Sequence, residues 1–243
     1  MPMHFPMQMS EMHDPARANR LPSTRHAIHV ADLRELAPRR VTDVLRQLAV
    51  MVHDAWSHCT DEFATAAQAE DVLRRRVEGG DQALFVALDH DGQVAGTGSI
   101  ARDDFYEGFS RANGVDPGYV GRDLHTATSW RGRVVDGLKI WEHMLEARLR
   151  WIARRGGAEL TVFTEPGPID LPALYRRLGA VVVKRGLHHR GLGRSSITML
   201  TYPVQAALMQ LAALRHRRLD HLAAMPFTTG PMHAARSSSP ALR

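Results

Sequence analysis

A short basic turn in the middle of the chain has the residue types needed to bind a phosphate group. An extended run that begins near residue 126 stops at Trp130, and Arg131, Gly132 and Arg133 follow before a long helical pattern. The first backbone N–H groups of a helix have no internal partner, and the helix dipole at that end favours anions. The two arginines add positive charge at the same place. The sequence therefore predicts a cradle for a pyrophosphate.

Two patterns downstream place this turn in a larger unit. The apolar residues at helical spacing after the turn are Leu138, Trp141, Leu145, Leu149 and Ile152. Residues 171–179 read Leu-Pro-Ala-Leu-Tyr-Arg-Arg-Leu-Gly, a short helix that ends at a glycine. The chain thus runs from a strand through a basic turn to a helix, and later into a second, shorter helix.

These motifs resemble those of the GNAT superfamily of acyl-CoA-dependent N-acyltransferases. The family signature is a strand, an Arg-Gly-x-Gly-x-Gly loop, a helix, a strand and a short helix ending in Leu-Tyr-x-x-Leu-Gly. Trp130-Arg131-Gly132 matches the start of the loop, and residues 173–180 match the second signature. Val134 and Asp136 stand where the family usually has glycines. The resemblance covers roughly residues 26–202.

The resemblance implies that acetyl-CoA binds here as the acyl donor. In this family the backbone of the strand before the loop pairs with the pantetheine arm, and the loop holds the pyrophosphate. The pantetheine residues would be Leu124, His125 and Thr126. The pyrophosphate residues would be Arg131, Gly132, Arg133, Val134, Val135, Asp136, Gly137 and Leu138.

The implied reaction is transfer of an acetyl group to a primary amine by direct attack. Such a reaction needs a base for the amine, polarisation of the thioester carbonyl and protonation of the leaving thiolate. The resemblance assigns the last role to Tyr175. A histidine titrates near neutral pH, so His125 is the first candidate for the base. Asp123 and Glu107 are alternatives that would act directly or through water.

The resemblance implies an α/β fold with a mixed, mainly antiparallel sheet flanked by helices and a parallel pair splayed around the cofactor. Apolar runs and alternation predict strands, and helical periodicity predicts helices. The expected strands cover residues 26–30, 83–88, 93–100, 160–164, 180–183 and 196–201, and the expected helices cover 41–56, 66–77, 138–152 and 171–178. We expect a disordered leader at 1–24, a GNAT-like acyltransferase domain at 25–202, an appended helix at 203–225 and a disordered tail at 226–243.

The amino-acid composition limits the ligands, the compartment and the metal sites that we expect for this chain. The formal charge of +5 suits an anionic ligand, but an aromatic content of 6% and scattered basic residues argue against nucleic acid. Cys59 is the only cysteine, so no intrachain disulfide forms and a reducing cytoplasm is the expected compartment. We expect no signal peptide and no membrane span. His188 and His189 have no acidic or cysteine partner at ligand spacing, so we expect no metal.

Four questions stay open at this point: the donor, the presence of catalysis, the acceptor and the role of the last helix. Relatives that take acyl groups from acyl carrier protein also tend to lose the glycine pattern, and the basic surface would suit such an acidic partner. A degenerate GNAT fold that binds a ligand without catalysis also fits, because Asp136 places a negative charge where an anion should lie. The acceptor is a small-molecule or peptide amine. The helix at 203–225 either packs on its own domain, which we expect, or supports a homodimer.

Overall fold

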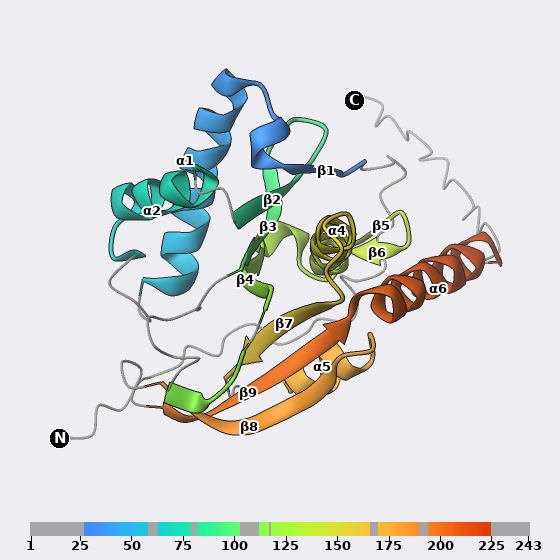
Figure 1. Cartoon of the computed structure of the whole chain (residues 1–243). Coiled ribbons are helices and arrows are strands. Elements are labelled where there is room, and N and C mark those ends of the chain that lie inside the picture. Colours follow the sequence, from blue (N-terminus) through green and yellow to red (C-terminus); the bar gives the residue numbers. More distant parts are fainter. Residues whose placement is uncertain are drawn as a thin grey trace, which may run out of the picture.

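The computed structural model describes residues 27–57, 63–78, 82–102, 112–116, 118–165, 170–189 and 194–224 (Figure 1). The strands are β1 (His29–Asp32), β2 (Gln82–Leu88), β3 (Val94–Ala101), β4 (Val120–Thr126), β5 (Val134–Val135), β6 (Leu138–Lys139), β7 (Glu159–Thr164), β8 (Val181–His189) and β9 (Arg194–Pro203). The α-helices are α1 (Pro38–Trp56), α2 (Ala66–Glu78), α4 (Ile140–Ala153), α5 (Leu171–Arg176) and α6 (Val204–Ala224). Two short 3-10 turns are η1 (Leu33–Glu35) and η3 (Thr128–Trp130).

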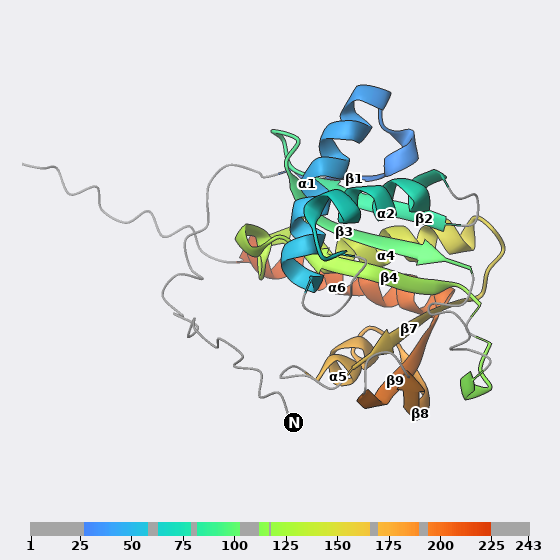
Figure 2. The same ribbon diagram turned by 90° about the vertical axis from the view of Figure 1, so that its left-hand side faces the viewer.

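Seven strands of the described residues form one sheet, in the order β1-β2-β3-β4-β7-β9-β8. Every neighbouring pair is antiparallel except β4 and β7, which are parallel. A single bridge, between Val120 and Thr161, joins these two strands. In both views β2, β3 and β4 run in a different direction from β9 and β8 (Figures 1 and 2). The expected mixed, mainly antiparallel sheet with a splayed parallel pair is confirmed.

Helices cover both faces of the sheet, and strand β2 shows why. Its residues are apolar on both sides, so alternate side chains enter two different cores. Leu84 and Val86 pack with α1 and α2, whereas Ala83 and Phe85 pack on the other face with α4. Figure 2 shows α1 and α2 in front of the strands and α4 and α6 behind them. Because β4 belongs to the same sheet, one of its faces is turned toward α1 and α2 and the other toward α4.

The other expected strands and helices are present, and their ends differ from the expectation mostly by a few residues. The extended run expected from residue 126 to Trp130 is wrong beyond Thr126, because β4 ends there and the 3-10 turn η3 covers Thr128–Trp130. The largest difference is in β8, which continues to His189 where a strand of residues 180–183 was expected, whereas β9 is longer than expected by two residues at each end. Gly179, expected to end the short helix, does so with a φ of +88°. Asp170 caps the start of α5, because its carboxylate accepts a hydrogen bond of 2.9 Å from the N–H of Ala173.

A hairpin separates the basic turn from α4, where the sequence predicted a direct entry into the helix. Strands β5 and β6 pair, and Asp136 and Gly137 form the two-residue turn between them. Both turn residues have positive φ, 46° and 78°, as a type I′ turn requires. Val135 and Leu138 are buried in the core. The hairpin is thus a folded element and not an open glycine-rich loop.

Helix α6 packs on its own chain, against α4 and the β5–β6 hairpin. Arg215 pairs with Glu146 of α4, with Nη2 2.5 Å from Oε2. Arg218 pairs with Glu142 through Nη1 at 2.5 Å and Nη2 at 3.1 Å, and it also donates to the carbonyl oxygen of Gly137. These contacts fix α6 over the start of α4. No helix among the described residues combines the length and apolar character needed to cross a bilayer.

Replacing Gly137 by alanine is expected to destabilise the protein more than the same change at Gly132. The two glycines have nearly the same φ, 78° and 77°. A Cβ at Gly137 would lie 2.7 Å from the backbone oxygen of Arg215, whereas one at Gly132 would meet nothing within 4 Å. Both variants lose about 1–2 kcal/mol from the left-handed backbone. Only Gly137→Ala also displaces α6, so its thermal midpoint should fall further, and equal midpoints would contradict this packing.

Candidate active site

The edge of β4 that faces β7 is open beyond Val120. The N–H of Thr161 bonds to the carbonyl of Tyr119 at 2.8 Å, and no later bridge joins the two strands in the described part of the chain. The N–H of Ala127 points to β3, where it bonds to Ala95 at 2.9 Å. Backbone groups alternate in direction along a strand, so those of Thr126 point to the open side, as do those of Leu124. An extended chain could pair with them.

A bulge interrupts β4 next to this open edge. Thr97 is opposite His125 and Ser99 is opposite Arg122, so two steps on β3 match three on β4. Asp123 lies in the bulge with a φ of 50°, which is uncommon for a residue with a side chain. The bulge turns the Asp123 side chain toward the face covered by α2.

Asp123 is bound by two elements. The Ser99 hydroxyl donates to Oδ2 at 2.8 Å, and the Arg76 guanidinium of α2 pairs with the same oxygen. The Arg76 and Asp123 side chains are only 9% and 11% exposed. Burial raises the pKa of Asp123, but the charges of Arg76 and Arg122 and these hydrogen bonds outweigh it, so the pKa lies below the ordinary value. A carboxylate held this way is a weak base, which makes Asp123 the poorer of the two described candidates.

His125 is the better candidate for the base. It is opposite Thr97, and Thr97 is opposite Val86, so all three share the face covered by α1 and α2. Burial lowers the pKa of His125, and the positive charge of Arg131 lowers it further. The imidazole is therefore neutral at pH 7 and able to accept a proton. Glu107, the third candidate, lies outside the described residues.

The basic turn lies at the end of the open edge. Arg131 Nε donates to the carbonyl oxygen of Thr126 at 3.4 Å, and the Arg133 guanidinium lies 5.0 Å from the centre of the Trp130 ring. Both arginines, Gly132, Val134 and Asp136 are exposed. The turn thus offers cationic side chains at the mouth of the gap between β4 and β7.

An internal carboxylate already occupies part of the helix start that the sequence predicted as an anion site. Glu142, 3% exposed, accepts a hydrogen bond of 2.7 Å from the N–H of Lys139. Arg218 neutralises this carboxylate from α6. A phosphate at this helix start would meet a negative charge. The exposed Arg131 and Arg133 are consequently the stronger candidates for phosphate contacts.

Tyr175 lies on the opposite face of the sheet from His125. Its ring is 6.2 Å from that of Trp141 on α4 and 6.0 Å from that of Tyr202 on β9. Burial raises the pKa of Tyr175, and the charge of Arg148 opposes that rise. A tyrosine that holds its proton at neutral pH has the protonation state required of a general acid.

Sequence reasoning missed Arg148, which is fully buried behind the gap. Its Nε has no hydrogen-bond partner among the described residues, and no ion pair described there neutralises it. A Cβ at Gly121 of β4 would lie 2.6 Å from Nη1, and one at Gly98 of β3 would lie 3.6 Å from Nε. The two glycines therefore leave room for the guanidinium. The available signal was an arginine four residues after Met144 on the apolar face of α4.

Comparisons with known proteins find similarity in structure only. No protein-family model and no curated protein matches the chain. A GNAT-family structure from Desulfovibrio desulfuricans has a TM-score of 0.50 at 14% identity, over 73% of this chain and 99% of that one. A spermidine N-acetyltransferase chimera from Vibrio cholerae and hSSAT has a TM-score of 0.52 at 9% identity, over 74% of this chain and 98% of that one. An aminoglycoside 6'-acetyltransferase type Ii has a TM-score of 0.51 at 14% identity, over 73% and 97%.

These structures match the present chain over nearly their whole length, so the shared part is a complete domain. The chain also has the features that the resemblance implied: the order of strands and helices, the gap between one parallel pair, and the short helix that ends at Gly179. The protein has the GNAT fold.

Proposed function

We propose that the protein transfers an acyl group from a thioester donor, most simply the acetyl group of acetyl-CoA, to a primary amine. The observation that carries this proposal is the open edge of β4, which ends in a cationic turn and has a candidate base and a candidate acid on opposite faces. Two similar structures are described as acetyltransferases of spermidine and of aminoglycosides, and both are amines.

In this proposal the donor lies in the gap between β4 and β7. The backbone groups of Leu124 and Thr126 pair with the amides of the pantetheine arm. Arg131 and Arg133 contact the pyrophosphate, together with the backbone from Gly132 to Leu138. Acetyl-CoA when bound supplies the activated acyl group, and the chain supplies position and proton transfer.

The proposed reaction uses one candidate group from each face of the sheet. His125 takes a proton from the ammonium form of the acceptor, so that the neutral amine attacks the thioester carbonyl. The carbon–nitrogen bond forms, the carbon–sulfur bond breaks, and the electron pair leaves with sulfur. Tyr175 donates its proton to the thiolate and becomes a phenolate. The phenolate then takes the second proton that the nitrogen loses as the amide forms, and His125 releases its proton to solvent. Because a tyrosine is a weaker acid than a thiol, the proton transfer to sulfur is uphill unless the phenolate is stabilised. Arg148 provides that positive charge.

The first test is calorimetric titration with acetyl-CoA. Arg131→Glu should weaken binding by about 10–100-fold, because it removes a charge-assisted contact and adds a repulsive charge. Arg39→Glu, at an exposed position of α1, is the matched control and should bind as the unmodified protein does. Equal affinities for both variants would contradict the assignment of the turn.

A second candidate donor is an acylated carrier protein. The observation that favours it is the start of α4, where Glu142 and Arg218 occupy part of a pyrophosphate site. A pantetheine arm attached to a carrier protein ends in a single phosphate. Such a donor has no free pyrophosphate for the turn to bind. Absence of acetyl-CoA binding with acylation from carrier protein would select this donor. Absence of both would support a binding protein without catalysis.

A further inference from the structure

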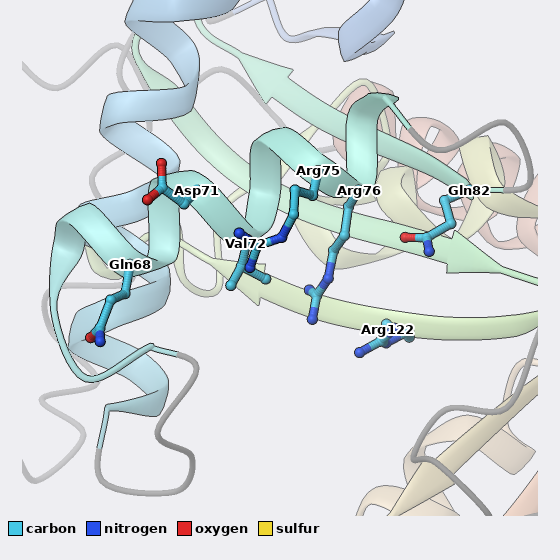
Figure 3. A pocket seen from close by; sticks show the side chains of 7 residues that line it. All are labelled: Gln68, Asp71, Val72, Arg75, Arg76, Gln82 and Arg122. Atoms are coloured by element: carbon cyan, nitrogen blue, oxygen red, sulfur yellow. The ribbon is translucent and has the colours of Figure 1, made fainter.

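A pocket beside the candidate active site is lined mainly by arginine and glutamine side chains. It lies between α2 and β4 and has a volume of about 430 Å³. Its lining residues are Gln68, Asp71, Val72, Arg75, Arg76, Gln82 and Arg122 (Figure 3). The only apolar side chain among them is that of Val72, so the described lining suits a polar group.

The charged side chains of this pocket favour a negatively charged group on a ligand. Figure 3 shows Arg76 extending from α2 toward β4, with Arg122 beyond its tip, while the carboxylate of Asp71 points away from both. Arg75 is exposed and makes no ion pair with another described residue. Three guanidinium groups and one carboxylate, that of Asp71, thus line the pocket. This excess of basic side chains suits an anionic group such as a carboxylate.

Part of the lining is rigid before any ligand arrives. Arg76 is buried, pairs with Asp123, and has its guanidinium 5.5 Å from the centre of the Phe63 ring. A guanidinium group recognises carboxylates with two parallel N–H donors, and a fixed guanidinium loses less freedom on binding than a mobile one. The pocket thus differs from a group of solvated surface arginines.

The pocket lies on the same face of the sheet as the candidate base. Arg122 is opposite Ser99, and His125 is opposite Thr97. Ser99 and Thr97 share the α1–α2 face with Leu84 and Val86. Arg122 and His125 are separated along β4 by roughly 8–10 Å, at 3.3 Å per residue less the shortening by the bulge. One acceptor molecule of moderate length would therefore reach both.

We propose that the acceptor is an amine that carries a carboxylate, and that Arg75, Arg76 and Arg122 bind this carboxylate while the amine reaches His125. This inference rests on the proposed acyl transfer for the role of the amine, but the carboxylate pocket is a separate structural feature. The acceptor class is therefore an amino acid or another amino-carboxylate, in contrast to a polyamine.

The test compares acceptors that differ at one end. With acetyl-CoA as donor, kcat/KM for ε-aminocaproate should exceed that for n-hexylamine and for cadaverine by tenfold or more. The double variant Arg75→Gln/Arg122→Gln should lose this preference. Arg74→Gln is the matched control, because Arg74 is next to Arg75 but pairs with Glu70 at 2.6 Å and does not line the pocket. It should keep the preference.

Other results would overturn the inference. Equal or better use of cadaverine, a preference for phosphoethanolamine, or an unchanged preference in the double variant would each do so. If acetyl-CoA does not bind, the proposed function fails, and the pocket is then tested alone by titrating ε-aminocaproate without a donor. Binding that is lost in the double variant and kept in Arg74→Gln supports the carboxylate site. No binding overturns it.

Discussion

Arg148→Met is expected to lower kcat for acyl transfer by about 10²–10³-fold, the cost of removing one preorganised group that stabilises charge in a transition state. The same variant should be more stable than the unmodified protein. Arg148 is fully buried with no ion pair among the described residues, so the folded state bears a desolvation cost that no partner offsets. Methionine fills a similar space without a charge.

The stability gain should be about 1–4 kcal/mol, the range seen when buried ionic groups give way to apolar ones. The activity loss has a different cause. Burial raises the pKa of Tyr175, and Arg148 is the positive charge that opposes the rise. Without it, the phenolate formed after proton donation has no counter-charge. A residue that weakens the fold and lowers the barrier to reaction is expected at a functional site.

Thermal unfolding and steady-state kinetics on the same preparation measure both effects. Arg148→Lys keeps the charge and is the control, so it should retain more activity than the methionine variant. Tyr175→Phe in the Arg148→Met background separates the roles further. If Arg148 acts through Tyr175, the second change should add little to the first. A methionine variant with full activity would remove Arg148 from the mechanism.

Asp123→Asn is expected to destabilise the protein by about 3–5 kcal/mol at neutral pH, because it breaks the buried ion pair between Arg76 and Asp123. Asparagine has nearly the same shape and tolerates the left-handed backbone that Asp123 adopts, so the change isolates the charge. Asp71→Asn, at an exposed position of α2, is the control and should change stability by less than about 0.5 kcal/mol.

The effect of Asp123→Asn should depend on pH in one direction. The folded pKa of Asp123 lies below its ordinary value of 3.8, so as the pH falls the unfolded chain takes up the proton first. The stability from Asp123 is fully present above roughly pH 5 and is lost as the pH falls through the folded pKa. Urea unfolding of both proteins from pH 3 to pH 7 should show curves that converge at the acid end. A constant difference would contradict the ion pair.

Local patterns were sufficient to predict most elements of the fold. The apolar run of β2 and the apolar spacing of α1, α2 and α4 depend on neighbouring residues only. The ends of β8 and β9 could not be predicted, because their pairing is with each other and not with local turn residues. The β5–β6 hairpin was missed for another reason. Asp136-Gly137 is itself a strong hairpin signal, but the resemblance led to a loop interpretation of the same residues.

The candidate site was less predictable than the fold. The sequence pointed to His125 and Tyr175, but their positions on opposite faces of the sheet follow from pairing with β3 and from packing of α5. Arg148 and the Arg76–Asp123 pair join residues far apart in the chain, and a charge pattern cannot show which charges become buried. The pyrophosphate, pantetheine and catalytic assignments remain predictions.

The single bridge between Val120 and Thr161 makes the sheet two half-sheets that share one point of backbone pairing. A donor chain lying in the gap would act as an additional strand, because it would pair with backbone groups on β4 that no described strand pairs with. Ligand occupancy then contributes to the cohesion of the whole domain, and binding free energy adds to folding free energy by mass action. While it is bound, the substrate helps to hold the two half-sheets together.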